Sequence, residues 1–167
     1  MRVDILNSCG NGDLHYNITI QPGSQILVGT CLVTTPSVSV TLPPVRAREF
    51  TGAGVTKGDT PLRIGLNCTP GANVYITLTD STNPGNRTDR LTPAASSTAG
   101  GIAMRLLHNG TPVAYGPDSD AAGTVNQWLV GASDSLTEVP LSAQYISTGT
   151  VTPGVVKGIA TFTMSYQ

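Results

Sequence analysis

The chain has 167 residues, enough for one domain, and only 11% of them are charged, against about 25% in typical soluble proteins. The net charge of −1 gives no electrostatic reason to expect nucleic acid or an anionic membrane as a partner. Disorder is also excluded, because disordered chains combine few apolar residues with high charge, whereas 39% of this chain is hydrophobic. The abundance of threonine, serine, glycine, valine and proline favours short strands joined by turns.

The first residues differ in character from the rest of the chain. They contain Cys9 and one alternating run, residues 14–20, which a Pro22-Gly23 pair ends. We expect residues 1–23 to be a linker or the remnant of a preceding unit. The main domain is expected to span residues 24–167.

Apolar residues alternate with polar ones along most of this main domain, with the period of two that is typical of strands. Asn109-Gly110 and several proline and glycine pairs mark turns between the strands. The alternating segments, in chain order, are residues 38–42, 62–68, 74–78, 102–106, 141–145 and 160–166. We found no convincing helical period, so the pattern predicts an all-β fold, a β-sandwich.

Candidate catalytic residues are few and poorly grouped. The histidines, His15 and His108, are not near a Gly-x-Ser-x-Gly elbow, so a serine hydrolase is not indicated. Asp118 and Asp120 form the only close carboxylate pair; turn bonding explains them better than glycosidase or calcium chemistry. Trp128 is the only tryptophan, and we expect it to pack in the core or at its edge. We expect no enzymatic activity, metal or cofactor.

The three cysteines are Cys9, Cys31 and Cys68, without a CxxC pair or a Cys/His cluster. Their spacing leaves two interpretations open. One is a single bridge with an odd cysteine, as in an exported protein cut from a longer one. The other is a set of three unrelated buried thiols.

Residues 29–167 resemble the pilin domain of bacterial chaperone–usher fimbriae. The resemblance lies in the joint order of several weak motifs rather than in any single one. These motifs are Gly29-Thr30-Cys31, Val40-Thr41-Leu42-Pro43-Pro44-Val45, Pro61-Leu62-Arg63-Ile64-Gly65-Leu66-Asn67-Cys68, Gly100-Gly101-Ile102-Ala103-Met104-Arg105-Leu106, Pro140-Leu141-Ser142-Ala143-Gln144-Tyr145 and the terminal strand with its penultimate Tyr166.

The resemblance implies an incomplete immunoglobulin-like β-sandwich that lacks its last strand, with a disulfide between Cys31 and Cys68. A groove beside the C-terminal strand is then expected to bind a donor strand or a chaperone. Its implied residues are Ala160, Phe162, Met164, Tyr166 and Gln167. The implied partners are a periplasmic pilus chaperone, an outer-membrane usher and the next fimbrial subunit. The implied location is the fimbrium at the cell surface, reached through the periplasm of a Gram-negative bacterium.

Within this family the chain looks most like the C-terminal half of a tip adhesin, particularly of the type 3 or type 1-like kind. More residues precede Cys31 than a short donor extension needs, and Cys9 has no partner in the pilin pattern. A host or surface receptor is then expected to bind only through a missing upstream domain.

Two alternatives remain. A shaft or adaptor pilin would carry its own donor strand at residues 14–20. A secreted carbohydrate-binding module or glycosidase would use Trp128, or Asp118 with Asp120.

Overall fold

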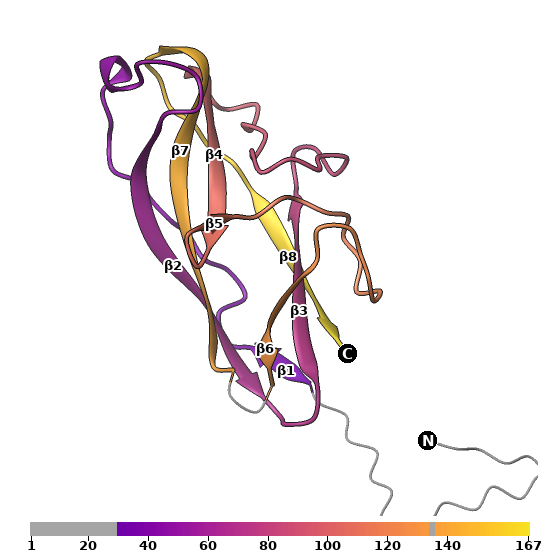
Figure 1. Ribbon diagram of the computed structural model, residues 1–167. Helices are drawn as coiled ribbons and strands as arrows, with labels where there is room; N and C mark the ends of the chain where they lie inside the picture. Colours follow the sequence, from indigo (N-terminus) through magenta and orange to yellow (C-terminus); the bar gives the residue numbers. More distant parts are fainter. Residues whose placement is uncertain (1–29, 134–135) are drawn as a thin grey trace, which may run out of the picture.

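Two antiparallel sheets make up the part of the chain that the computed structural model describes, residues 30–133 and 136–167 (Figure 1). One sheet has five strands in the order β1-β2-β7-β4-β5, and the other has three in the order β6-β3-β8. The elements are β1 (Cys31–Val33), the 3-10 helix η1 (Ala47–Glu49), β2 (Thr56–Cys68), β3 (Asn73–Asp80), β4 (Gly100–His108), β5 (Thr111–Pro112), β6 (Trp128–Ala132), β7 (Glu138–Thr152) and β8 (Ala160–Tyr166). The expected all-β, immunoglobulin-like sandwich is confirmed.

The expected boundary between residues 1–23 and 24–167 lies outside the described residues. The same holds for Cys9, His15 and the alternating run at residues 14–20. Within the part that is described, no helix is long and apolar enough to cross a membrane.

The core lies between the sheets, and β3 supplies its best-covered side chains. Val74, Ile76 and Leu78 are 0%, 0% and 3% exposed, as expected for the inward face of a strand with neighbours on both sides. Two clusters of buried residues form this core, and the side chains of Phe162 and Trp128 pack against both of them. β8 therefore contributes to the whole core from the edge of its sheet.

The expected strand at residues 38–42 is wrong, since this segment follows β1 as irregular chain. The pairing of β1 with β2 stops here for identifiable reasons. Pro36 has no N–H to donate, and the Thr35 hydroxyl, rather than a backbone carbonyl, accepts the Gly65 N–H at 2.6 Å. On β2, Pro61 also lacks an N–H. Residues 38–42 therefore have the alternation of a strand without a ladder to join.

The other alternating segments all lie in strands, and the Asn109-Gly110 turn joins β4 to β5. Both turn residues have positive φ, 50° and 77°, as a type I′ hairpin turn requires. Strand β6 was not expected as a strand. It is short, and it contains a bulge at Val130, because the adjacent residues Val74 and Tyr75 of β3 pair with Gly131 and Leu129. The bulge interrupts the alternation that would mark a strand in the sequence.

A buried carboxylate fixes the loop that leaves β3. Asp80 is 1% exposed, and its oxygens accept hydrogen bonds from the backbone of Thr82, Asn83 and Thr92 and from the Asn86 side chain, at 2.8–3.1 Å. Burial alone would raise the pKa of Asp80, but these hydrogen bonds to the charged form outweigh it and the pKa is lowered.

Replacing Asp80 with asparagine should lower the free energy of unfolding by at least about 2 kcal/mol near pH 7, because hydrogen bonds to a charged acceptor are lost. A carboxylate whose pKa is lower in the folded state stabilises the fold above its unfolded pKa. That contribution disappears as the pH falls below about 4. Urea unfolding of the wild type and Asp80→Asn at about pH 7 and pH 3 measures the effect.

The matched control is Asp120→Asn, the same substitution at an exposed aspartate. We expect that control to unfold like the wild type at both pH values. An equal difference between the wild type and Asp80→Asn at the two pH values would contradict the role given to the ionised carboxylate.

Candidate functional site: the seam between β1 and β8

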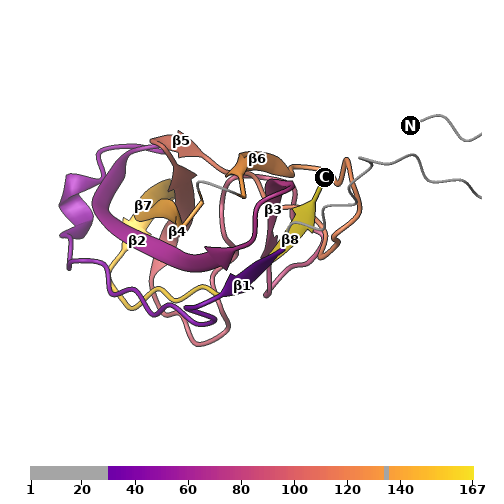
Figure 2. The same ribbon diagram turned by 90° about the horizontal axis from the view of Figure 1, so that it is seen from below.

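Two sheet edges lie side by side on one side of the sandwich. β1 ends the five-stranded sheet and β8 ends the three-stranded sheet, and no described strand pairs with the outer side of either. Figure 2 shows β1 and β8 next to each other near the C terminus. We call this region the β1–β8 seam and define it by Cys31 and Val33 on β1 and by Ala160, Phe162, Met164 and Tyr166 on β8.

The backbone of β8 presents unpaired ladder groups to this seam. Gln167 and Asn73 exchange both of their backbone hydrogen bonds, at 2.8 and 3.0 Å, and Ser81 N–H donates to the Ile159 carbonyl at 3.0 Å. Hydrogen-bonded positions alternate along an antiparallel ladder. The odd-numbered residues of β8 therefore point their N–H and C=O groups at β3, and the even-numbered residues 160–166 point theirs at the seam.

Three of these even-numbered residues, Ala160, Phe162 and Met164, pack their side chains against the core and are incompletely covered, whereas the Tyr166 side chain is exposed. Phe162 and Met164 pack against the core but remain half-buried, as do Val33 and Leu62 from the other sheet. Their neighbours on β3 are fully covered. Half-buried side chains also pack against the core elsewhere, on β6 and β4, but those of β8 and β1 lie along the unpaired edges of the seam.

A disulfide holds the other wall of the seam. Cys31 on β1 and Cys68 on β2 are directly paired and are joined by a disulfide, the bond that the family resemblance implied. It closes a loop with a sequence separation of 37 residues, which corresponds to about 4 kcal/mol in the chain-entropy treatment. A strand as short as β1 is thereby fixed to its sheet.

The C-terminal residues close one end of the seam. The Tyr166 hydroxyl accepts a hydrogen bond from Cys31 N–H at 3.1 Å and donates one to the Cys31 carbonyl at 3.0 Å. The Gln167 side chain donates to the side chain of Gln127 at 2.9 Å and to that of Ser165 at 3.3 Å. Four of the expected site residues, Ala160, Phe162, Met164 and Tyr166, thus lie along the unpaired edge of β8, whereas the backbone of Gln167 pairs with Asn73 of β3.

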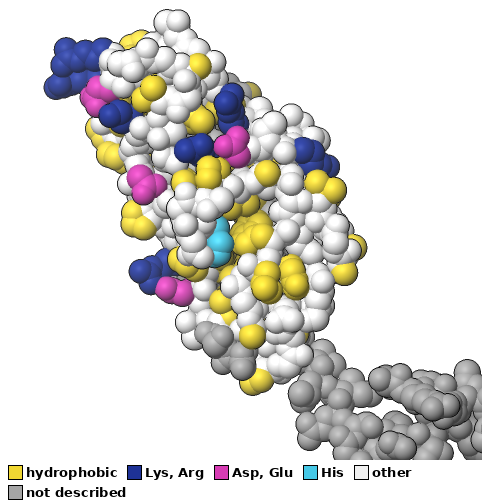
Figure 3. Space-filling view, in the orientation of Figure 1, with side chains coloured by type: hydrophobic (Ala, Val, Ile, Leu, Met, Phe, Trp, Pro, Cys, Tyr) yellow, Lys and Arg dark blue, Asp and Glu magenta, His cyan; other side chains and the backbone are white. Residues whose placement is uncertain are grey.

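The opposite side of the sandwich has edges too, at β5 and β6. Figure 3 shows hydrophobic side chains gathered there around His108, the only histidine among the described residues. The His108 ring lies 5.9 Å from the Trp128 ring and its Nδ1 is 3.0 Å from the Pro140 carbonyl oxygen. β5 has only two residues and β6 only five, so each edge strand on this side is shorter than β8 with its seven.

The residues weighed for other chemistry do not form a site. Asp118 is exposed and accepts a hydrogen bond from the Thr163 hydroxyl, while Asp120 is exposed on the same loop. Trp128 is half-buried against the core, as expected for a packing residue. In the described ranges no three histidine, cysteine or acidic side chains are grouped to hold a metal ion.

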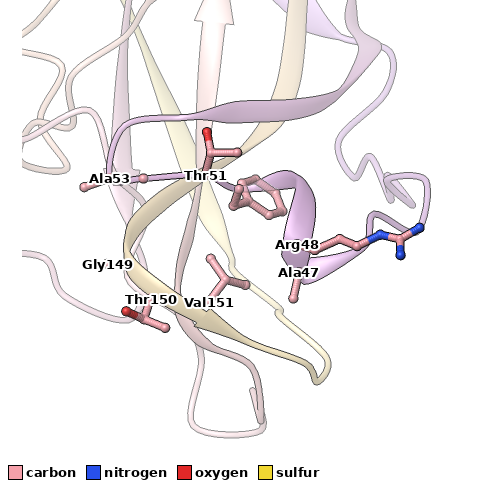
Figure 4. A pocket seen from close by; sticks show the side chains of 9 residues that line it. Ala47, Arg48, Thr51, Ala53, Gly149, Thr150 and Val151 are labelled. Atoms are coloured by element: carbon pink, nitrogen blue, oxygen red, sulfur yellow. The ribbon is translucent and has the colours of Figure 1, made fainter.

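Two shallow hollows lie away from the middle of the seam. The larger, about 580 Å³, is at the end of the sandwich far from the C terminus, where η1 meets β7; its lining includes Ala47, Arg48 and Val151. Figure 4 shows the Arg48 side chain extending away from the other labelled side chains. The smaller, about 290 Å³, is lined by residues that include Pro70, Asn73 and Gln167. Neither hollow groups catalytic side chains.

Comparison of sequences relates the chain to known fimbrial proteins. The sequence model of the family described as "Fimbrial protein" matches residues 17–167. The F17c-G fimbrial adhesin of Escherichia coli is 39% identical over 169 residues, covering 96% of this chain and 49% of the adhesin. The F17 fimbrial protein of Escherichia coli is 31% identical over 163 residues, covering 92% of this chain and 89% of that protein. The chain thus spans about half the length of its adhesin relatives.

Solved structures share the fold. The P pilus rod subunit PapA superposes with a TM-score of 0.59 at 17% identity, over 82% of this chain and 99% of that subunit. The CupB6 tip adhesin from Pseudomonas aeruginosa superposes with a TM-score of 0.56 at 21% identity, over 70% of this chain and 32% of the adhesin. A family of structural and adhesive subunits implies a non-catalytic role. The chain therefore belongs to the fimbrial protein family, as a chaperone–usher pilin domain of the fimbrium on the surface of a Gram-negative bacterium.

Proposed function

We propose that this domain joins an adhesive subunit to the fimbrium by donor-strand complementation, with the β1–β8 seam as the groove that receives the next subunit's strand. One observation carries the proposal. Ala160, Phe162 and Met164 of β8 have ladder groups that face away from β3, and their apolar side chains are half-buried against the core. A strand added there satisfies the backbone and completes the core together.

The gain from such an added strand is large compared with the stability of a domain. Ladder hydrogen bonds supply affinity, and alternate side chains entering the core supply specificity. Each apolar side chain that becomes buried contributes roughly 1.5–3 kcal/mol, so four or five of them give on the order of 6–15 kcal/mol. Whole domains have stabilities of only about 5–15 kcal/mol. We therefore expect the domain to depend on a partner strand.

The same open edge requires protection before assembly, because an unpaired apolar edge promotes aggregation. In this proposal a periplasmic chaperone covers the seam first, and at the outer-membrane usher the strand of the next subunit replaces it. The C-terminal carboxylate of Gln167 would be held by basic residues of the chaperone, which sets the pairing register. Register matters, since a one-residue slip turns every inward side chain of a strand outward.

The adhesin assignment rests on sequence similarity. The adhesin relatives are more similar to this chain than the F17 fimbrial protein is, at 39% against 31% identity. Under this assignment, receptor binding belongs to a domain upstream of the chain. The high coverage of the F17 fimbrial protein, 89%, favours the alternative of a shaft or adaptor pilin whose donor strand is at residues 14–20. The reading frame upstream of residue 1 distinguishes the two, by encoding either a further domain or a signal peptide.

A donor peptide should raise the melting temperature of the purified chain and reduce its self-association. The probe is a synthetic peptide with the sequence of residues 12–22, whose apolar residues alternate as a donor strand requires. Scanning fluorimetry and size-exclusion chromatography measure the two effects. The same peptide with Ile18 replaced by aspartate is the control and should have no effect. A soluble monomer whose melting temperature ignores a large excess of the first peptide would count against the groove.

Phe162→Asp should prevent folding and chaperone capture together. A large core side chain costs about 3–5 kcal/mol when lost, and burying a charge costs more. Thr161 is the matched control, because it is exposed on the same strand and faces away from the core. Co-expression with the chaperone and a pull-down should recover Thr161→Asp and not Phe162→Asp. Equal recovery of the two variants would show that the inward face of β8 is not required.

Removing Tyr166 and Gln167 should weaken chaperone capture more than it disturbs the sandwich, because the carboxylate then lies two positions too early. The pull-down yield is compared with the circular dichroism spectrum of the released protein. A second variant, with two glycines added after Gln167, moves the carboxylate while keeping Tyr166. If both variants are captured as well as the intact chain, the carboxylate does not anchor the chaperone.

A further inference from the structure

Tyr166 makes a contact across the seam that the rest of β8 does not make. Its hydroxyl binds both backbone groups of Cys31, accepting from the N–H at 3.1 Å and donating to the carbonyl at 3.0 Å. These two residues lie 135 positions apart in the sequence. The contact thus joins the edges of the two sheets at one end of the seam.

The groups that Tyr166 binds are ladder groups facing the seam. Thr69 N–H donates to the Thr30 carbonyl at 2.8 Å, and Thr34 N–H donates to the Gly65 carbonyl at 2.9 Å. Because hydrogen-bonded positions alternate, Cys31 points its N–H and C=O groups away from β2. Val33 does the same one pair further along, where no tyrosine reaches.

The hydroxyl therefore takes the place of a neighbouring strand at Cys31. A strand added beside β1 would form hydrogen bonds with the N–H and the C=O of Cys31, and the hydroxyl already makes both of these bonds. The space for one absent strand between two edges is about 10 Å, twice the usual spacing of about 4.8 Å. A tyrosine side chain extended from β8 and followed by a hydrogen bond spans such a distance.

We propose that the Tyr166 hydroxyl is a stop that ends the donor-strand ladder before Cys31. The donor then pairs with Val33 and with residues 160–164 of β8, and its terminus is positioned by the tyrosine. The disulfide to Cys68 prevents Cys31 from moving aside, so the stop is rigid. This inference rests on the proposed function, and it makes Tyr166 a positioning residue for the length and register of the donor.

Amide hydrogen exchange of the full chain, followed residue by residue by NMR, tests the stop. In the free protein, the Cys31 amide should exchange at least about tenfold faster in Tyr166→Phe than in the wild type, because only the hydroxyl is removed. Tyr75→Phe is the matched control. Tyr75 is a half-buried tyrosine of the same three-stranded sheet, paired with Ser165, and the loss of its hydroxyl should leave the Cys31 amide unchanged.

The second measurement adds the synthetic peptide of residues 12–22 to each protein. In the wild type, the amides of Val33, Phe162 and Met164 should become protected while that of Cys31 stays as it was. In a second variant, Tyr166→Ala, the Cys31 amide should become protected as well, because neither the hydroxyl nor the ring then occupies the donor's place beside Cys31. Each of these results would support the stop.

Two results would overturn the stop while leaving the proposed groove in place. One is an equally fast Cys31 amide in the wild type and in Tyr166→Phe without peptide. The other is a Cys31 amide that gains protection when the peptide binds the wild type. If the peptide protects none of the seam amides, the proposed groove and the stop fail together. This result differs from the first two, in which only the stop fails.

Discussion

The arrangement of the domain depends on β8, a strand that contributes to both parts of the core but has a partner strand on one side only. β8 is joined to the sandwich by its ladder with β3 on one side only, yet Phe162 packs against both core clusters. A residue that holds both halves of the core thus lies on a strand with one partner. The buried Asp80 at the end of β3 and the disulfide at β1 fix the elements on each side of this strand.

The period of two in a strand explains why one set of residues serves both the backbone and the core. Side chains alternate between the faces of a sheet, and ladder groups alternate between its two edges. On β8 the two alternations coincide at Ala160, Phe162 and Met164. Under the proposed function, a strand added beside them gains hydrogen bonds and apolar contacts at the same positions.

The seam is not the same at its two ends. Near the C terminus, Tyr166 and the disulfide-linked Cys31 join the two sheets. Near the start of β8, Ile159 is 60% exposed, and no comparable cross-link is present among the described residues there. Under the proposed function, this asymmetry favours one alignment of an entering strand, because alternating sequences otherwise pair in several registers.

Local patterns were sufficient to predict most strands, the Asn109-Gly110 turn and the inward face of β8, because alternation and turn preference are properties of a few adjacent residues. They were insufficient at residues 38–42, where Thr35, Pro36 and Pro61 end the ladder despite a regular alternation. They also could not predict that Tyr166 meets Cys31. Whether a strand has a neighbour on each edge depends on residues far away in the chain, so only the tertiary structure decided which edge remains open and where it is closed.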